Sequence, residues 1–158
     1  MHKIVSKEKL KARLQKLRQE GKTIVFTNGC FDILHVGHVR YLREAKKLGD
    51  VLILALNSDT SVRAIKGEKR PLVPEDERAD IMAALECIDF VVIFPETTPR
   101  ELIEYLEPHI LVKGGDWREE AIAGADFVKG TGGRVVTIPL TEGRSTTNIV
   151  EKIRQVYG

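Results

Sequence analysis

Five short apolar runs, separated by segments of helical character, constrain the fold of this 158-residue chain more than any other feature. The runs occupy residues 23–27, 51–56, 90–94, 110–112 and 135–138. Nearly continuous apolar strands of this kind are buried on both faces, as in a parallel sheet. Because parallel strands need crossover connections, the alternation predicts an α/β, Rossmann-like doubly wound fold with a five-stranded parallel sheet flanked by helices.

Apolar spacing and end signals predict three of these helices within a single domain of residues 1–158. An opening helix within residues 1–21 has the stripe Leu10, Leu14 and Leu17, and Gly21 ends it. A second helix follows Pro74 with an acidic first turn, and its stripe is Ile81, Ala84 and Leu85. The last helix has Ser145 as its expected N-cap. The stripe of this last helix is Ile149, Val150, Ile153 and Val156 or Tyr157.

Composition excludes several classes of function. The chain has 25 Lys and Arg against 23 Asp and Glu, so no overall positive field attracts nucleic acid or an anionic membrane. It has no apolar run of about 18 residues and no signal-peptide stretch at its start. Cys30 and Cys87 lack the CxxC spacing of a zinc or redox site. We therefore expect a cytoplasmic protein with reduced thiols that binds neither nucleic acid nor membrane.

Four polar segments directly follow predicted strands. They are residues 28–38, 57–70, 113–117 and 139–148. In a doubly wound fold the ligand binds beyond the carboxyl ends of the strands, near the point where strand order reverses. We therefore expect these segments to converge on one rim of the sheet.

The first polar segment contains two histidines, His35 and His38, spaced to lie on one side of a helical turn. Gly29 is expected to let the chain bend off the strand, and a helix starting near Val36 or Gly37 aims free N–H groups at an anion. The two imidazoles can then donate hydrogen bonds to a polyphosphate. Two other interpretations are a helix cap with a core histidine, and a metal pair, although neither HExxH nor a cysteine cluster accompanies them.

Basic and hydroxyl residues in the other segments suit phosphate binding. Ser145, Thr146 and Thr147 offer hydroxyls beside unpaired helix N–H groups, and Arg144 adds a fixed charge, whereas an ordinary N-cap accounts only for Ser145. A Gly- and Pro-containing loop can close over phosphates as a lid, or it can be a solvated charged loop. The basic residues of this loop are Lys66, Lys69 and Arg70.

The segment 113–117 combines a cation, paired glycines, a carboxylate and an indole. Lys113 is placed to point a charge into the cleft, and the glycines bring the backbone close to a ligand. Asp116 can accept hydrogen bonds from sugar hydroxyls. Trp117 either packs against the nucleotide or sugar, or fills the core.

Residues 27–38 (TNGCFDILHVGH) and 141–147 (TEGRSTT) resemble the two signatures of the His-x-Gly-His, cytidylyltransferase-like nucleotidyltransferase superfamily. From about residue 22 onward, segments such as LVKGGDW and NSDTSVRAIKGEKRP resemble the adenylyltransferases that make ADP-heptose, either free-standing or as the carboxyl-terminal half of a bifunctional kinase and adenylyltransferase. The kinase half is not part of the resemblance. The related glycerol-3-phosphate cytidylyltransferases have Arg and Ile where this chain has Leu140 and Arg144.

The resemblance implies transfer of AMP from ATP to a sugar 1-phosphate, most closely D-glycero-β-D-manno-heptose 1-phosphate. The products are ADP-heptose, used for the lipopolysaccharide core, and pyrophosphate. Mg²⁺ is expected to arrive with ATP, and a homodimer is the expected assembly. The alternatives are a glycerol-3-phosphate cytidylyltransferase-like enzyme that uses CTP and a nucleotide-binding module without catalysis.

Three sets of site residues follow, with no protein metal ligands among them. The catalytic set is His35, His38 and Lys66. The nucleotide-binding set is Thr27, Asn28, Gly29, Cys30, Phe31, His35, His38, Lys113, Gly115, Arg144, Ser145, Thr146 and Thr147. The acceptor-binding set is Asn57, Asp59, Lys66, Lys69, Arg70, Asp116 and Trp117. Asp32 is expected to brace the turn after the first strand.

Overall fold

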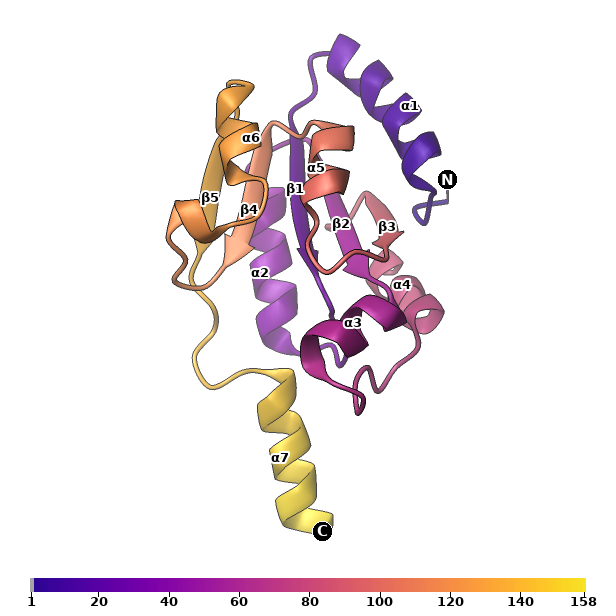
Figure 1. Cartoon of the computed structure of the whole chain (residues 1–158), viewed down its shortest axis with the longest axis vertical. Coiled ribbons are helices and arrows are strands. Elements are labelled where there is room, and N and C mark those ends of the chain that lie inside the picture. The colour runs from indigo at the N-terminus through magenta and orange to yellow at the C-terminus, as the bar shows by residue number, and fades with distance from the viewer. Residues whose placement is uncertain (1) are drawn as a thin grey trace.

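The sheet of this protein has five parallel strands, as the sequence predicts. A computed structural model describes residues 2–158 (Figure 1). The strands are β1 (Ile24–Gly29), β2 (Val51–Asn57), β3 (Phe90–Phe94), β4 (Ile110–Gly114) and β5 (Arg134–Ile138). They lie in the order β3-β2-β1-β4-β5 with every pair parallel. The strands β2 and β3 are added on one side of β1, and β4 and β5 on the other. The strand order therefore reverses between β1 and β4, where ligands bind in doubly wound sheets.

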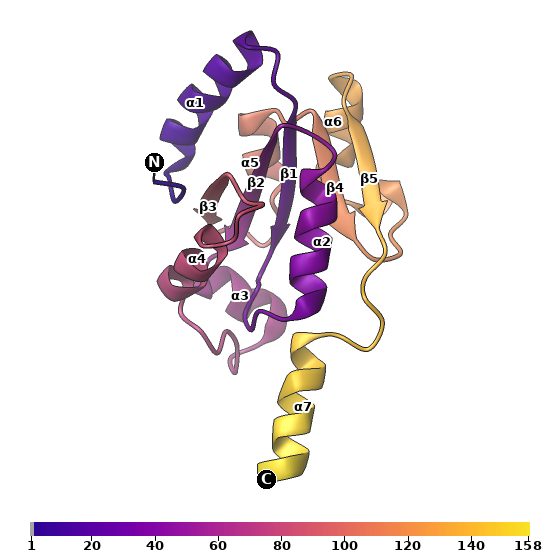
Figure 2. The same ribbon diagram turned by 180° about the vertical axis from the view of Figure 1, so that it is seen from behind.

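Helices cover both faces of the sheet (Figures 1 and 2). On one face lie α1 (Lys7–Gln19), α5 (Arg100–Leu106) and α6 (Ala125–Gly130), which pack on alternate strand residues such as Phe26 and Ile53. On the other face lie α2 (Val36–Lys46) and α4 (Glu75–Ala83), which pack on the intervening residues such as Leu52 and Leu54. Alternation of side chains between two covered faces explains the continuous apolar runs.

Three further elements lie near the carboxyl ends of the strands. They are α3 (Asp59–Lys66), the 3-10 helix η1 (Glu119–Ala121) and α7 (Thr146–Tyr157). The sequence predicted a loop where α3 stands, because this segment is polar. Ser58 caps α3 by accepting a hydrogen bond from the N–H of Ser61, so the helix forms with only Ser61 and Val62 buried.

The opening helix is confirmed. Leu10 and Leu14 of α1 are fully buried, and Leu17 packs against the same core. Ser6 caps its start, and Gly21 follows its end with a positive φ of 76°, the left-handed conformation that glycine favours.

Two sequence expectations about burial are wrong. In α4 the buried residues are Arg78, Ala79 and Met82, whereas Ile81 is 43% exposed. The helix ends at Ala83, so the expected stripe includes residues that no longer follow its period. The edge strand β5 is not buried on both faces: none of its residues is buried, and its Arg134 is exposed, whereas the other edge strand, β3, is mostly buried.

The last helix begins where the sequence predicts but packs differently. Ser145 caps α7 by accepting a hydrogen bond from the N–H of Asn148. None of the residues of α7 is buried, and Ile153 and Val156 are 52% and 60% exposed, so its apolar stripe is not part of the core. The helix projects away from the carboxyl end of the sheet (Figures 1 and 2). Within residues 2–158, no helix has the length and apolarity needed to cross a membrane.

Candidate active site

One cavity of about 850 Å³ lies at the carboxyl ends of the strands and draws residues from all four polar segments. Asn28 comes from the end of β1, Asn57 from β2, Lys113 from β4 and Thr141 from the segment after β5. The expected convergence of these segments on one rim is therefore confirmed.

His35 and His38 form the start of α2 and line the cavity. His35 is the N-cap, and its Nδ1 accepts a hydrogen bond from the N–H of Gly37 at 3.1 Å. The Nδ1 of His38 accepts a hydrogen bond from the N–H of His35 at 3.3 Å. The two rings stack with their centroids 3.7 Å apart and their planes 28° apart. This reciprocal cap fixes both rings relative to the helix.

The hydrogen bonds to Nδ1 determine the chemical form of both histidines. Because each Nδ1 accepts a hydrogen bond from a backbone N–H, the proton of each neutral ring resides on Nε2. Burial, and then the charge of His35, lowers the pKa of His38 to about 4. Burial, and then the charge of Arg144, lowers the pKa of His35. At neutral pH the pair consists of neutral Nε2–H donors, so capping the helix and donating into the cavity are compatible roles.

Glycines keep space for the rings around α2. A Cβ on Gly37 would lie 2.9 Å from the ring of His35, so Gly37 lets that ring fold back over the helix start. A Cβ on Gly29 would lie 2.6 Å from the ring of Phe31. The expected turn at Gly29 is wrong in detail, because the positive φ of 47° belongs to Phe31. Gly29 instead makes room for the ring that this turn directs back towards it.

Asp32 connects the histidine segment to the basic loop. Its carboxylate accepts hydrogen bonds from the N–H groups of Leu72 and Val73, each at 2.9 Å, and lies 3.5 Å from Nη1 of Arg70. The sequence predicted that Asp32 braces its own turn. It braces the neighbouring loop instead, and so holds Arg70 at the cavity wall.

Arg78 is a buried junction that the sequence interpretation missed. Its side chain is fully buried, and it donates hydrogen bonds to the carbonyls of Val73, Cys30 and Asn57 at 2.6 to 2.9 Å. It also pairs with the Asp59 carboxylate at 2.8 Å. One guanidinium thus joins the basic loop, the segment after β1 and the end of β2. The only signal in the sequence is an arginine in phase with Ala79 and Met82.

Four cationic side chains line the cavity. Lys66 at the end of α3, Arg70, Lys113 and Arg144 all line it. Burial is the main reason that the pKa of Lys113 is lowered; the Cys30 thiol opposes this shift and the charge of Lys66 adds to it. Burial also raises the pKa of the Cys30 thiol, which therefore stays protonated at neutral pH. An anion that entered between these lysines would relieve their repulsion.

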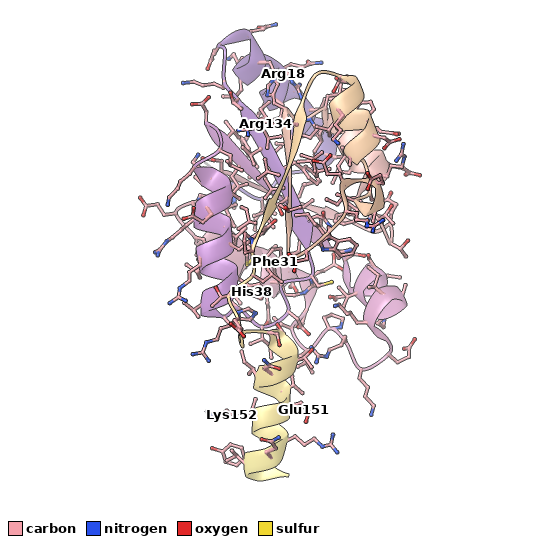
Figure 3. The ribbon with its side chains drawn as sticks, turned by 90° about the vertical axis from the view of Figure 1, so that its left-hand side faces the viewer. Arg18, Phe31, His38, Arg134, Glu151 and Lys152 are labelled. Carbon is pink, nitrogen blue, oxygen red and sulfur yellow. The ribbon has the colours of Figure 1, made fainter. Side chains whose placement is uncertain are left out.

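Most residues predicted for the site line this cavity. Those that do are Asn28, Gly29, Cys30, Phe31, His35, His38, Asn57, Lys66, Arg70, Lys113, Trp117, Arg144, Ser145, Thr146 and Thr147. Trp117 is 47% exposed, so the core-filling interpretation is wrong. Phe31 and His38 lie side by side where α7 meets the rest of the protein (Figure 3).

Five predicted residues do not line the cavity: Thr27, Asp59, Lys69, Gly115 and Asp116. Thr27 is fully buried, and its hydroxyl lies 2.6 Å from the hydroxyl of Tyr41 beneath the site. Asp59 is paired with Arg78. Lys69 and Asp116 are exposed, and Gly115 provides the positive φ of 98° that ends β4.

The cavity also has lining residues that the sequence interpretation missed. Thr97, Thr98 and Pro99 follow β3, Ala121 ends η1, and Ile122 and Ala123 follow η1. These residues are uncharged, so no pattern of phosphate-binding chemistry indicated them. For the metal-pair alternative, residues 2–158 contain no group of three His, Cys, Asp or Glu side chains able to hold a metal ion.

Comparison with known sequences identifies close relatives. The sequence profile of the Cytidylyltransferase-like family matches residues 26–152. The bifunctional protein HldE of Syntrophotalea carbinolica is 59% identical over 155 residues, 98% of this chain and 32% of that protein. HldE of Geobacter metallireducens is 62% identical over 141 residues, 89% of this chain and 29% of that protein. The chain therefore spans about a third of the length of these curated relatives.

Solved structures share the fold. The lipopolysaccharide core biosynthesis protein from Thermoplasma volcanium GSS1 has a TM-score of 0.62 at 28% identity, over 78% of this chain and 100% of that one. A pantoate-beta-alanine ligase from Francisella tularensis has a TM-score of 0.64, over 93% of this chain and 69% of that one. Its 16% identity shows the fold alone. Because the family profile covers most of its length, this chain belongs to the cytidylyltransferase-like family.

Proposed function

We propose that this protein transfers AMP from ATP to D-glycero-β-D-manno-heptose 1-phosphate, giving ADP-heptose and pyrophosphate. The observation that carries this proposal is the pair of neutral Nε2–H donors, His35 and His38, in one cavity with the start of α7 and several cations. Such an arrangement stabilises negative charge that develops on phosphate oxygens. It supplies no activated serine or cysteine nucleophile, and the reaction needs none, because the acceptor phosphate is itself nucleophilic.

The proposed reaction is a direct displacement. An oxygen of the acceptor phosphate attacks the α-phosphorus of ATP and forms the new P–O bond. The bond from the α-phosphorus to the bridging oxygen of the β-phosphate breaks, and its electron pair leaves with pyrophosphate. His35 and His38 donate hydrogen bonds to the phosphate oxygens, while Lys66 and Arg144 offset the charge of the departing group.

The start of α7 is the proposed binding place for the triphosphate. Ser145, Thr146 and Thr147 line the cavity at the start of α7, a helix of 12 residues whose first N–H groups attract anions. The Ser145 hydroxyl already accepts a hydrogen bond from the N–H of Asn148, and the Thr146 hydroxyl donates one to the Ile33 carbonyl at 3.2 Å. Thr147 and the free backbone N–H groups are therefore the proposed hydrogen-bond donors to the phosphates.

We propose that Mg²⁺ enters as part of the MgATP substrate. The fit of the residues to a protein-held ion is poor, because residues 2–158 offer no cluster of three ligating side chains. The Asp32 carboxylate is already occupied by two N–H groups and Arg70. When bound, the ion neutralises phosphate charge, and the chain contributes the alignment of both substrates.

Similarity supports the choice of acceptor. The HldE relatives and the Thermoplasma lipopolysaccharide core biosynthesis protein are consistent with the heptose acceptor implied by the sequence. Leu140 and Arg144 replace residues typical of CTP-dependent glycerol-3-phosphate enzymes, which supports ATP. The expected homodimer and cytoplasmic location stay predictions.

Measuring pyrophosphate release tests the proposal. The purified protein would receive MgATP or MgCTP with a panel of sugar 1-phosphates, and mass spectrometry would identify the nucleotide sugar. We expect release with ATP, fastest with heptose 1-phosphate, and loss of turnover when a chelator removes Mg²⁺. Nucleotide binding without release for every acceptor would indicate a binding module, and a preference for CTP would contradict the assignment of ATP.

A further inference from the structure

The wall of the cavity that follows β3 has a chemistry different from the rest. Thr97 and Thr98 are exposed and line the cavity, although β3 is the edge strand of the sheet. The end of η1 adds Ala121, and the segment after it adds Ala123 and the buried Ile122. These residues carry no charge, whereas Lys66, Arg70, Lys113 and Arg144 lie elsewhere in the lining. The cavity lining thus includes, besides its cations, a set of neutral residues that offer hydroxyl and apolar groups.

A buried polar chain holds the threonine segment in place. The Asn57 amide donates to the Ser61 hydroxyl at 3.0 Å, and Ser61 donates to the Glu96 carbonyl at 2.7 Å. Asn57 and Ser61 are almost completely buried. The N–H of Ser58 also donates to the Phe94 carbonyl at 3.0 Å. The backbone just before Thr97 is therefore fixed by α3 and β2, which lets the two hydroxyls be positioned without a ligand.

The two segments of the neutral wall are also joined to each other. Arg100, at the start of α5, forms two hydrogen bonds of 2.9 Å with the Asp126 carboxylate in α6. Lys129 of α6 pairs with Glu119 of η1, which holds the second segment together. Figure 1 shows α5 and α6 on the same face of the sheet. The Arg100–Asp126 pair thus joins the start of α5, which follows Thr97 and Thr98, to α6, which follows Ile122, and all three residues line the same cavity.

We propose that Thr97 and Thr98, with Ile122, bind the uncharged, polyhydroxylated body of the acceptor and so select which sugar phosphate reacts. The inference rests on the proposed function. The triphosphate half of the cavity is at α7, after β5, and the histidines follow the central strand β1. Because β3 lies at the opposite edge from β5, its loop is the remaining place for a second substrate to meet the α-phosphate. Neutral hydroxyls suit sugar hydroxyls, and Ile122 suits the apolar face of a sugar ring.

Replacing the hydroxyls by methyl groups tests this assignment. The variants are Thr97→Val, Thr98→Val and the double variant, and Thr60→Val on the exposed face of α3 is the matched control, since Thr60 does not line the cavity. With one neutral hydrogen bond lost per substitution, the KM for the sugar 1-phosphate should rise about fivefold in each single variant and about 25-fold in the double variant. The KM for ATP should not change, and Thr60→Val should resemble the unaltered protein.

Two outcomes separate this inference from the proposed function. If pyrophosphate is released normally but the KM for the sugar phosphate stays unchanged, or the KM for ATP rises equally, the acceptor assignment of Thr97 and Thr98 is overturned and the proposed function stands. If no acceptor supports pyrophosphate release, the proposed function fails. Calorimetry with the sugar 1-phosphates then still decides whether Thr97 and Thr98 bind the sugar. Weaker binding in the double variant would then support the subsite, and equal or absent binding in both proteins would overturn it.

Discussion

Two helix starts meet at the cavity, and they are anchored very differently. The start of α2 carries His35 and His38, and the same helix buries Tyr41, Leu42 and Ala45 in the core. The start of α7 lies beside it, yet no residue of α7 is buried. Figure 3 shows His38 at the end of the packed region, whereas Glu151 and Lys152 lie on the projecting helix. Core packing fixes the donors of α2 before substrate binds, but it does not fix α7.

This difference indicates that the starts of α2 and α7 have different roles in the site. Rings that are held by backbone hydrogen bonds and by a packed helix need little reorganisation when charge develops on the substrate. A helix start without buried side chains depends on contacts such as that between Thr146 and the Ile33 carbonyl, and on the anion itself. Substitutions in α2 should therefore affect turnover most, and substitutions along α7 should affect stability least.

Replacing His38 by alanine should have the largest effect on turnover. The change removes one Nε2–H donor, so kcat should fall about a hundredfold to a thousandfold, as for the loss of an oxyanion donor. Circular dichroism should show a retained fold. His2→Ala, in an exposed residue outside the cavity, is the control and should keep its activity. Near-normal turnover of His38→Ala would contradict the proposed role.

Replacing Arg78 by alanine should loosen the support beneath the histidine segment. Three carbonyls and the Asp59 carboxylate would lose a buried donor, so the free energy of unfolding should fall by about 3 kcal/mol. Urea denaturation measures this change. Arg63→Ala, in an exposed residue of the neighbouring helix α3, should cost little. Equal stability of the two variants would show that Arg78 is not a structural junction.

Gly37→Ala should displace the ring of His35 with little loss of stability. The new Cβ would lie 2.9 Å from that ring, so the ring must move, and kcat should fall about tenfold because one donor is misplaced. Gly130→Ala in α6 is the control, since nothing lies within 4 Å of its Cβ. Steady-state kinetics and thermal unfolding distinguish the two. An unchanged kcat in Gly37→Ala would mean that the position of the His35 ring does not matter.

The smallest effect is expected on α7. Ile153 is 52% exposed, so Ile153→Ala should change the free energy of unfolding by less than about 0.5 kcal/mol. The same truncation at the fully buried Leu14 should cost about 2 to 5 kcal/mol. Chemical denaturation of both variants gives the comparison directly. A large loss for Ile153→Ala would show that the apolar stripe of α7 is packed in solution.

The fold was predictable because its strands are short, nearly continuous apolar runs, and parallel strands that are covered on both faces require helices between them. The rim followed from topology, since parallel strands place the segments after them at one edge. The α3 helix was missed because its cap, rather than an apolar stripe, defines it. The α4 stripe was misplaced because Arg78, a charged residue, occupies a buried position that Ile81 was expected to fill.

The site was predictable where the side chains are of types that bind phosphate, as with His35, His38 and Lys113. Arg78 was missed because its partners are backbone carbonyls from separate segments, which no residue type reveals. Thr97 and Thr98 were missed because, unlike Thr146 and Thr147, they have no predicted helix start beside them. The expected turn at Gly29 was wrong because the tight conformation belongs to Phe31, a residue with no turn preference.

The lowered pKa of His38 predicts the direction in which stability changes with pH. The folded pKa of His38, about 4, lies below the 6.5 of an unperturbed histidine. As pH falls below 6.5 the unfolded chain takes up a proton that the folded chain does not, so the contribution of His38 reduces stability progressively down to about pH 4. Above pH 6.5 the residue is neutral in both states and makes no such contribution.

Nitrogen-15 NMR of the imidazole groups tests the central claim most directly, because it reports the protonated nitrogen and the pKa of each ring. We predict that at pH 7 both His35 and His38 are neutral with the proton on Nε2, and that His38 gains its second proton only near pH 4. A proton on Nδ1 in either ring, or titration of His38 near 6.5, would contradict the account of the pair as preorganised neutral donors.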